Sequence, residues 1–389
     1  MEKQIKVLEV LDTYYPKFDG PCLVVTSLSK SFLKAGKAKP SVVVPRFPKY
    51  KDEQPFNVFR VKSIKTKEGY YGAIPGVDCK LKAFLKENKP DIIHMHSPFT
   101  MCKYFVKYGR KHNIPTIFTF HTKFGEDFDR MLKLKCLRKF MMNYIMSNIN
   151  KADHVWTVSY GAGECLKEYG YKKPIKVIRN GTDLVYPENA RALIQRINDK
   201  HNLTENEVIF LSVGRIVENK RLQFALSALK HVSDLGYNFK YFIVGDGNYV
   251  GKLQSLVKEY GLENKVIFTG KIMDREELSA YYLRANLFVF PSTFDTASLA
   301  PIEAAAMKLP TLMTKGCSTA EIITDGENGF LGEQNENTWA DIIVDLLENR
   351  EKLEKAKEKA YKQVYRTWDS VAEEILENYK EIIKNKGAK

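Results

Sequence analysis

The chain has 389 residues, of which 44% are apolar and 12% aromatic. This length exceeds one ordinary core and suffices for two domains, and the composition excludes a disordered chain or a small disulfide scaffold. No apolar run approaches the roughly 18 to 20 residues that a membrane-spanning helix needs. The first ten residues lack the clean apolar core of a secretory signal. We therefore expect a soluble, cytoplasmic protein.

The charge is divided unevenly along the chain, whose formal net charge is +14. Residues 1–190 hold 34 Lys and Arg against 18 Asp and Glu, whereas residues 191–389 hold 27 against 29. A basic N-terminal half indicates an anionic partner, either nucleic acid or a membrane surface. Because no zinc-finger spacing, RNP-like strand or recognition-helix pattern is present, we expect no nucleic-acid partner. The six scattered cysteines, without a CxxC pair, predict buried free thiols and no structural zinc site.

In chain order, short apolar runs alternate with amphipathic stretches, which is typical of parallel βαβ units. The first half is predicted to contain strands at 5–11, 41–44, 58–61, 92–96, 116–120 and 154–158, and helices at 24–34, 79–87 and 101–112. After a loop at 179–183, the second half is predicted to contain strands at 208–213, 241–244, 266–269, 287–290 and 311–314, and helices at 223–235, 250–260, 275–283, 300–307 and 320–325. The fold class expected is α/β with two doubly wound parallel sheets.

The most informative motif is the segment 291–306, which leaves a strand, crosses a loop of small residues and enters a helix. A helix N-terminus at the carboxyl end of a parallel strand is where an anion or sugar diphosphate binds. Asp295 and Glu303 lie eight residues apart in this segment. Taken alone, the pair is equally compatible with a helix cap and a surface glutamate.

This Asp-x7-Glu element resembles the Glu-x7-Glu element of retaining, nucleotide-sugar-dependent glycosyltransferases of the GT-B fold, family four. Asp295 stands in place of the first Glu, and Ser298 in place of a usual Gly. The resemblance implies that Asp295 contacts a hydroxyl of the donor sugar and that Glu303 binds the ribose. It also places Ser298 and Leu299 in the donor-binding loop.

A second segment, 213–220, resembles the Gly-Arg…Lys segment of the same family. The resemblance implies that Arg215 and Lys220 hold the donor diphosphate. Two cations at a strand end would also stabilise the negative charge that a leaving nucleoside diphosphate develops. An ordinary basic loop is the alternative, and Arg221 occupies the position of a usual Gly.

Further segments resemble the family in the same order. Those expected to bind the donor are the loop 14–20 with Gly20, the glycine turn with Gly245 and Gly247, and the nucleobase-side loop with Lys271 and Ile272. His121, which follows a strand, is expected to lie beside the reacting sugar, although a lone histidine there is more often structural. The resemblance implies three parts: an acceptor-side domain at 1–178, a donor domain at 179–364, and a C-terminal helix at 365–389 that returns to the first domain.

Two segments have residues typical of metal sites. His94 and His96 alternate with Met95 along a strand, and we expect their rings on opposite faces of the sheet, which disfavours a metal site. Asp127 and Asp129 form a DxD, the metal-binding signature of the other large glycosyltransferase fold, but acids that open a helix favour its dipole. We therefore expect no metal and no other cofactor.

These observations predict a retaining, metal-independent glycosyltransferase that uses a nucleoside-diphosphate sugar. A nucleotide-sugar 2-epimerase on the same scaffold is the alternative, distinguished by formation of the 2-epimer from UDP-N-acetylglucosamine. A non-catalytic basic binding protein is a further rival.

The acceptor is predicted from charge rather than from the family. Residues 130–152 contain no acid, and apolar residues recur at helical spacing at Met131, Leu134, Leu137, Met141 and Tyr144. This pattern predicts one helix, with its apolar stripe either packed in the first domain or lying on a membrane. In the second case Lys133, Lys135, Arg138 and Lys139 would contact anionic headgroups on the inner face of the cell membrane. The acceptor would then be a lipid or lipid-linked glycan.

Overall fold

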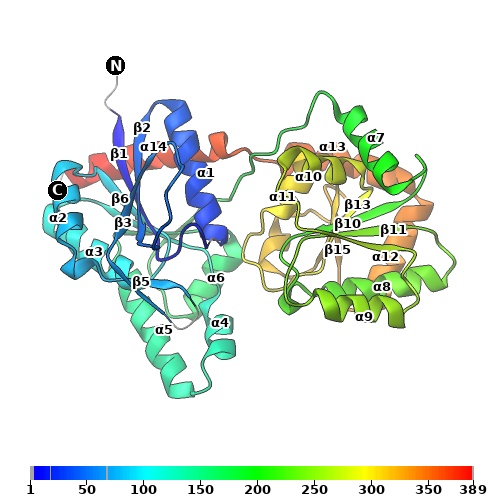
Figure 1. Ribbon diagram of the computed structural model, residues 1–389, viewed down its shortest axis with the longest axis horizontal. Helices are drawn as coiled ribbons and strands as arrows, with labels where there is room; N and C mark the ends of the chain where they lie inside the picture. The colour runs from blue at the N-terminus through cyan, green and yellow to red at the C-terminus, as the bar shows by residue number, and fades with distance from the viewer. Residues whose placement is uncertain (1–3, 18, 67–68, 388–389) are drawn as a thin grey trace. The chain divides into compact units, whose positions relative to one another are not determined.

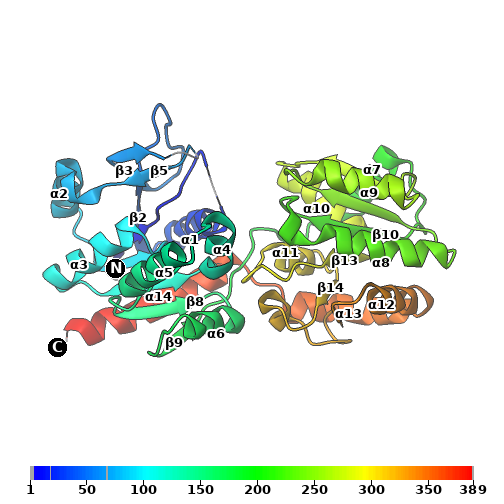
Figure 2. The same ribbon diagram turned by 90° about the horizontal axis from the view of Figure 1, so that it is seen from below.

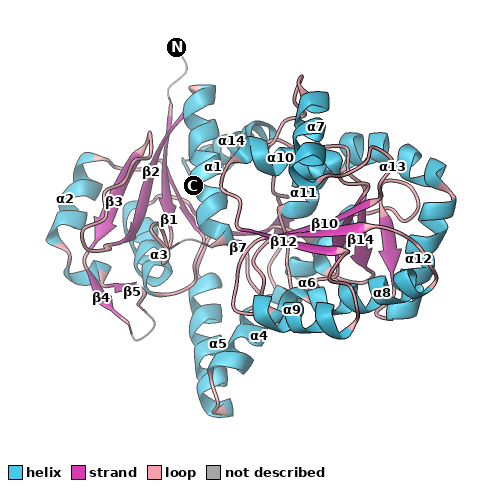
Figure 3. Ribbon diagram, turned by 45° about the vertical axis from the view of Figure 1, so that its right-hand side comes forward, coloured by secondary structure: helices cyan, strands magenta, loops and turns pink. Residues whose placement is uncertain are grey.

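The computed structural model describes residues 4–17, 19–66 and 69–387. Phe18, in the loop 14–20, lies outside the described residues. The chain forms two compact units: the N unit contains residues 1–180 and 368–389, and the C unit contains residues 181–367. In each unit helices pack on both faces of one parallel sheet (Figure 3). No helix among the described residues is both long enough and apolar enough to cross a membrane.

The N unit is built on a seven-stranded parallel sheet with the order β3-β2-β1-β6-β7-β8-β9. Its strands are β1 (Ile5–Val10), β2 (Ala38–Pro45), β3 (Asn57–Val61), β6 (Ile92–Met95), β7 (Thr116–Phe120), β8 (His154–Thr157) and β9 (Ile175–Val177). A separate antiparallel pair joins β4 (Ser63–Lys65) to β5 (Tyr71–Ala73). The chain reverses its direction across the sheet between β1 and β6, which is the switch point where Rossmann-like sheets bind ligands.

The helices of the N unit are α1 (Gly20–Ala35), α2 (Cys79–Glu87), α3 (Thr100–His112), α4 (Phe124–Met131), α5 (Lys135–Ile149), α6 (Tyr160–Glu168) and α14 (Trp368–Gly387). The last of these, α14, lies beside α1 although more than 300 residues separate them (Figures 1 and 2). The Ser31 hydroxyl donates to Asp369 at 2.7 Å, and the rings of Phe32 and Tyr379 lie 6.0 Å apart. The C-terminal helix therefore completes the N unit.

The C unit repeats this plan with the strand order β12-β11-β10-β13-β14-β15. Its strands are β10 (Ile209–Val213), β11 (Lys240–Val244), β12 (Val266–Gly270), β13 (Leu287–Phe290), β14 (Thr311–Thr314) and β15 (Phe330–Gly332). Its helices are α7 (Ala190–His201), α8 (Leu222–Asp234), α9 (Val250–Glu259), α10 (Arg275–Arg284), α11 (Ala300–Ala306), α12 (Glu336–Glu348) and α13 (Arg350–Gln363). One core contains apolar residues of α8, α9 and α12, and the other contains those of α7, α10 and α11.

Three local predictions are wrong. The helix predicted at 320–325 is a short 3-10 turn, Ser318–Ile322. The single helix predicted from residue 131 onward is broken, because α4 ends at Met131 and Leu132 and Leu134 adopt extended backbone angles before α5 begins. Only two of the six free cysteines, Cys22 and Cys102, are buried, so the thiols are not uniformly interior.

Candidate functional site

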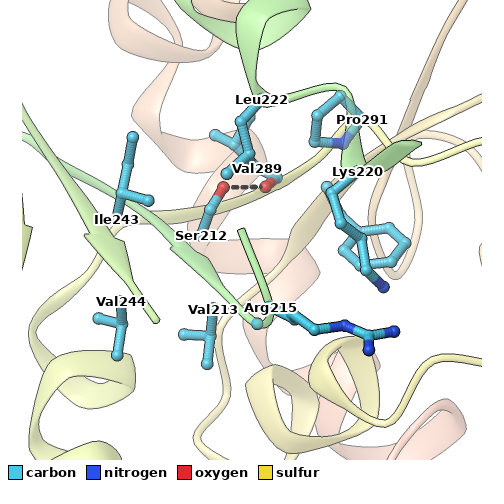
Figure 4. A pocket seen from close by; sticks show the side chains of 11 residues that line it. Ser212, Val213, Arg215, Lys220, Leu222, Ile243, Val244, Val289 and Pro291 are labelled. Carbon is cyan, nitrogen blue, oxygen red and sulfur yellow. Dashed lines mark hydrogen bonds between the residues drawn. The ribbon is translucent and has the colours of Figure 1, made fainter. Parts of the chain in front are cut away.

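A pocket in the C unit opens at the carboxyl ends of β10, β11 and β13, where the strand order reverses (Figure 4). The pocket is open, and the space of about 310 Å³ between its walls includes bulk solvent. Its lining residues are Ser212, Val213, Gly214, Arg215, Lys220, Leu222, Ile243, Val244, Val289, Phe290 and Pro291. The floor is apolar, and the side chains that carry positive charge, Arg215 and Lys220, lie at one side of it. Such a site suits an anionic ligand with an apolar portion.

The Lys220 ammonium group is paired with a carboxylate from a distant loop. Its Nζ donates to both oxygens of Asp295, at 2.6 and 2.8 Å. The Ser292 hydroxyl donates to Asp295 as well, at 2.5 Å, and the Thr319 hydroxyl donates to the Asp295 carbonyl oxygen at 3.0 Å. Both charged side chains are about one-fifth exposed. The structure therefore brings together two predicted site residues that are 75 positions apart in the sequence.

Arg215 is exposed and is held in place by the glycine turn. A Cβ at Gly245 would lie 1.8 Å from the carbonyl oxygen of Gly214, and a Cβ at Gly247 would lie 2.0 Å from that of Ile216. The Ile216 amide also donates to the Asp246 carbonyl oxygen at 2.9 Å. Only glycine permits this approach, so both predicted glycines support the loop that carries Arg215.

Arg221, which occupies the position of a usual Gly, has a left-handed backbone with a φ of 54°. This is a conformation that glycine adopts without steric cost and that other residues adopt less readily. The left-handed backbone conformation therefore favours glycine at this position. The Arg221 side chain compensates by donating to Gln334 at 2.9 Å and lying over the Phe224 ring.

Glu303, on α11, is buried and already paired. Its carboxylate accepts from Arg275 at 2.9 Å and from the Tyr282 hydroxyl at 3.0 Å. Burial raises the pKa of Tyr282 well above its usual value, with the nearby Glu303 adding to the effect. A ribose hydroxyl would therefore have to share this carboxylate with Arg275.

The remaining predicted donor-site residues lie on loops or at the start of a helix. Ser298 and Leu299 are half-buried at the start of α11, whereas Lys271 is exposed and Ile272 is half-buried after β12. Gly20, in the N unit, is the exposed first residue of α1, and the Asp19 side chain caps that helix by accepting from the Cys22 amide at 3.0 Å.

The corresponding switch point of the N unit holds a network of buried polar side chains. The Nδ1 atom of His96 lies 2.9 Å from Nε2 of His121, and Nε2 of His96 lies 2.7 Å from Glu9. His94 lies beside them, with Tyr379 at 2.5 Å from Nδ1 and Thr119 at 2.6 Å from Nε2. These side chains come from β1, β6, the end of β7 and α14. Of this group, only His121 was predicted as a site residue, and His94 and His96 were considered only as metal ligands. Polar residues within apolar strands at 9, 94 and 96 were a signal for the network.

The expectation that His94 and His96 face opposite sides of the sheet is wrong. Their ring centroids lie 4.2 Å apart, because residues two positions apart in a strand share a face and only successive residues alternate. Among the described residues, one group of side chains has the composition of a metal site: Glu9, His94 and His96, with ligand atoms within 4.8 Å of one another. Both nitrogens of each ring are already hydrogen bonded, so we interpret the group as a hydrogen-bond network.

Burial sets the ionisation of this network. It raises the pKa of Glu9 to about 8 and lowers that of His96 to about 3. The pKa of His121 is held well below its usual value by burial and by the adjacent His96. All three groups are therefore uncharged near pH 7, which suits a neutral partner such as a sugar hydroxyl.

A pocket lies beside the histidines within the N unit, and the space of about 280 Å³ between its walls includes bulk solvent. It is lined by Val24 and Leu28 of α1, by Trp368, Val371 and Ile375 of α14, by His94, His96, Thr119, His121, Trp156 and Val158 of the strand ends, and by Ile178, Arg179 and Asn180. The structure thus places His121 at the wall of a pocket rather than in the core.

The region of α4 and α5 exposes apolar and basic side chains together. Met131, Leu134, Leu137 and Phe140 are 60%, 64%, 40% and 65% exposed. Lys133, Lys135 and Lys139 are also exposed. We call these seven residues the α4–α5 patch. Exposure of the first three apolar residues argues against packing of this stripe in the N unit.

Arg138 does not share this exposed character. It donates to Asp129 at 2.7 Å and to the carbonyl oxygen of Leu132 at 2.5 Å, so it stabilises the turn between α4 and α5. Asp127 lies in the first turn of α4, where an acid favours the helix dipole.

Two family descriptions match successive parts of the chain: "Glycosyltransferase Family 4" over residues 20–186 and "Glycosyl transferases group 1" over residues 194–363. The chain belongs to the group 1 glycosyltransferases with the GT-B fold.

This glycosyltransferase has curated relatives with named activities. It is 26% identical over 342 residues to an "Alpha-monoglucosyldiacylglycerol synthase" of Streptococcus pneumoniae, covering 86% of this chain and 77% of that protein. It is 22% identical over 381 residues to a "GDP-mannose-dependent alpha-(1-6)-phosphatidylinositol dimannoside mannosyltransferase" of Mycobacterium tuberculosis, covering 96% and 95% of the two chains.

Solved structures share its fold. A glycosyltransferase from Rickettsia africae superposes with a TM-score of 0.76 at 20% identity, covering 98% of this chain and 99% of that one. The Anabaena protein Alr3699/HepE, solved in complex with UDP, superposes with a TM-score of 0.74 at 18% identity, covering 97% and 100%.

Proposed function

We propose that this glycosyltransferase moves a sugar from a nucleoside-diphosphate sugar to a membrane lipid or lipid-linked glycan, with retention of anomeric configuration and without a metal ion. The donor part of the proposal rests on the C-unit pocket, and the acceptor part rests on the α4–α5 patch. The proposed location is the inner face of the cell membrane.

Arg215 and Lys220 are proposed to hold the donor diphosphate. They carry positive charge at the ends of parallel strands, beside an apolar pocket. When the bond between the anomeric carbon and the phosphate oxygen breaks, negative charge develops on the diphosphate, and fixed cations stabilise it. This role needs no metal, because the side chains supply the positive charge.

Asp295 is proposed to orient the donor sugar rather than to attack it. Its carboxylate is engaged by Lys220 and Ser292, which makes it a poor nucleophile. The acceptor oxygen would instead attack from the face that the phosphate leaves, with its proton passing to a phosphate oxygen. One bond to the anomeric carbon breaks and another forms on the same face, so the configuration is retained.

The lipid acceptor is supported by one observation, the exposed α4–α5 patch. Large apolar side chains beside lysines suit a membrane surface, where the apolar groups reach the acyl boundary and the lysines meet anionic headgroups. Each lysine contributes roughly 1 kcal/mol near an anionic surface. Two relatives bear names of lipid-modifying enzymes, which is consistent with this acceptor class.

The donor is tested by a screen of nucleoside-diphosphate sugars for release of the diphosphate, with and without vesicles that contain diacylglycerol or phosphatidylinositol. We expect one donor to turn over, and faster with vesicles. Absence of turnover with every donor, or conversion of UDP-N-acetylglucosamine to its 2-epimer, would contradict transferase activity of the proposed kind.

Membrane binding is tested by sedimentation with vesicles of varied anionic content. Replacing Lys133, Lys135 and Lys139 with Gln should weaken binding on the order of 100-fold at low salt, since each contributes roughly 1 kcal/mol. The matched control replaces Lys80, Lys82 and Lys86, which are exposed on α2. Leu134→Ser should also weaken binding, whereas Ile64→Ser, at an equally exposed position on β4, should not. Equal binding of the patch and control variants would favour a soluble acceptor.

A further inference from the structure

Two hydrogen bonds join Glu9, His96 and His121, and the position of their protons determines which group donates and which accepts. Each of these two hydrogen bonds contains one hydrogen atom, and each ring of His96 and His121 carries one hydrogen when neutral. Only two arrangements satisfy both bonds. Either Glu9 donates to His96 and His96 donates to His121, or both bonds run the opposite way.

The surroundings of Glu9 select the first arrangement. Its side chain is fully buried, and no lysine or arginine among the described residues lies within ion-pair distance of it. Its neighbours are His96 at 2.7 Å, His94 at 3.8 Å and the Tyr379 hydroxyl at 3.5 Å. A buried carboxylate without a cation is costly, whereas a neutral carboxylic acid can donate its proton to His96.

We propose that Glu9 acts through His96 to fix the tautomer of His121, so that Nε2 of His121 accepts a hydrogen bond and Nδ1 carries the proton. A group that binds Nδ1 of His121 must then be an acceptor, such as the oxygen of a sugar hydroxyl. Glu9 and His96 are positioning residues in this scheme, since neither is placed in contact with substrate.

Burial supports this assignment independently of the bond lengths. It raises the pKa of Glu9 to about 8, so the carboxyl group keeps its proton near neutral pH. The low pKa values of His96 and His121 keep both rings uncharged, which leaves one proton on each. The consequence for catalysis rests on the proposed function together with the expectation from the sequence that His121 lies beside the reacting sugar, whereas the tautomer itself does not.

The tautomer is read directly from long-range ¹H–¹⁵N correlation spectra of the protein labelled with ¹⁵N-histidine, at pH 7. The signals of His121 are assigned by their loss in His121→Asn. We expect Nδ1 of His121 to be protonated and Nε2 unprotonated in the wild-type protein. Protonation at Nε2 in the wild-type spectrum would overturn the proposal, whatever the variants do.

Variants of Glu9 test whether Glu9 fixes the tautomer of His121. Glu9→Leu removes the donor, and we expect a mixed or inverted tautomer at His121 and a kcat lowered on the order of 10-fold with KM little changed. Glu9→Gln restores an N–H donor and should recover the wild-type tautomer and most of the lost kcat. Ser29→Ala, which alters another buried polar group of the N unit, is the matched control and should change neither.

The tautomer and the activity together distinguish failure of the proposed Glu9 network from failure of the proposed role of His121 in transfer. An unchanged tautomer in folded Glu9→Leu overturns the role of Glu9. If Glu9→Leu does not fold, Glu9→Gln provides the test. A shifted His121 tautomer in Glu9→Gln would contradict the proposal that Glu9 donates a hydrogen bond to His96. A wild-type tautomer as expected, combined with full activity of His121→Ala, would leave the network correct and contradict the proposed role of His121 in transfer.

Discussion

The two units have the same arrangement of central strands but opposite kinds of polar site at the switch point. In the C unit the loops after β10 and β13 present Arg215, Lys220 and Asp295, which are charged and accessible to solvent. In the N unit the ends of β1, β6 and β7 hold Glu9, His96 and His121, whose pKa values are shifted toward the neutral forms.

This difference shows that strand order fixes where a site lies, whereas burial fixes its chemistry. Cations at an open strand end attract an anion such as a diphosphate. Titratable groups inside the sheet lose their charge and can only exchange hydrogen bonds, which suits neutral hydroxyls.

The largest expected effect comes from removing charge in the C unit. Lys220→Ala deletes one diphosphate contact and also leaves the half-buried Asp295 without its cation. We expect the transfer rate to fall about 100-fold or more, and Arg215→Ala to act similarly. The measurement is diphosphate release at saturating acceptor.

Lys258→Ala is the matched control, because Lys258 is exposed in the last turn of α9. Near-normal turnover of Arg215→Ala and Lys220→Ala, both folded as judged by circular dichroism, would contradict the assignment of the diphosphate site.

The second-largest effect is expected at the glycine turn, where a substitution tests whether this turn supports the Arg215 loop. Gly247→Ala places a Cβ 2.0 Å from the carbonyl oxygen of Ile216, so one backbone must move. We expect the free energy of unfolding to fall by about 1–3 kcal/mol, together with weaker donor binding. Thermal unfolding and a donor titration measure both.

Gly251→Ala is the control for the turn. Nothing lies within 4 Å of the added Cβ on α9, and alanine favours a helix over glycine by roughly 0.5–1 kcal/mol. An equal response of Gly247→Ala and Gly251→Ala would show that the close approach is not required.

The stability of the protein should depend on pH through Glu9 of the N unit. The pKa of Glu9 rises on folding from about 4.5 to about 8, so the folded state binds more protons than the unfolded state between these pH values. The stabilisation is therefore complete below pH 4.5 and is lost as the pH rises to about 8, with a slope of at most about 1.4 kcal/mol per pH unit.

Comparison with Glu9→Gln isolates this contribution, because His94, His96 and Tyr379, the titratable groups that face Glu9, are present in both proteins. We expect the wild-type protein to lose stability relative to Glu9→Gln as the pH rises from 5 to 8, measured by urea unfolding. A constant difference would mean that Glu9 is not buried in its neutral form.

The smallest expected effect concerns metal. EDTA should leave the transfer rate largely intact, and Asp127→Asn should be tolerated, because Arg215 and Lys220 supply the positive charge. Inhibition by EDTA that Mg²⁺ or Mn²⁺ reverses would instead assign a metal to the diphosphate.

Much of the architecture could be predicted because strand and helix formation follow local periodicity. The strands β7, β13 and β14 coincide with their predicted ranges, and α2 does as well. The break between α4 and α5 could not be predicted, because apolar residues continue at steps of three or four across it and Leu132 and Leu134 can adopt either conformation.

The family, the two parallel sheets and the order of the motifs could be predicted from the sequence, since these depend on residues close together in the chain. Which side chains meet depends on the tertiary fold. Lys220 and Asp295 are 75 positions apart, and Glu9 and His96 are 87 apart. The tertiary fold also determines their burial, which separates the charged site of the C unit from the neutral network of the N unit, because a pKa shift depends on the surrounding dielectric and partners rather than on the residue type.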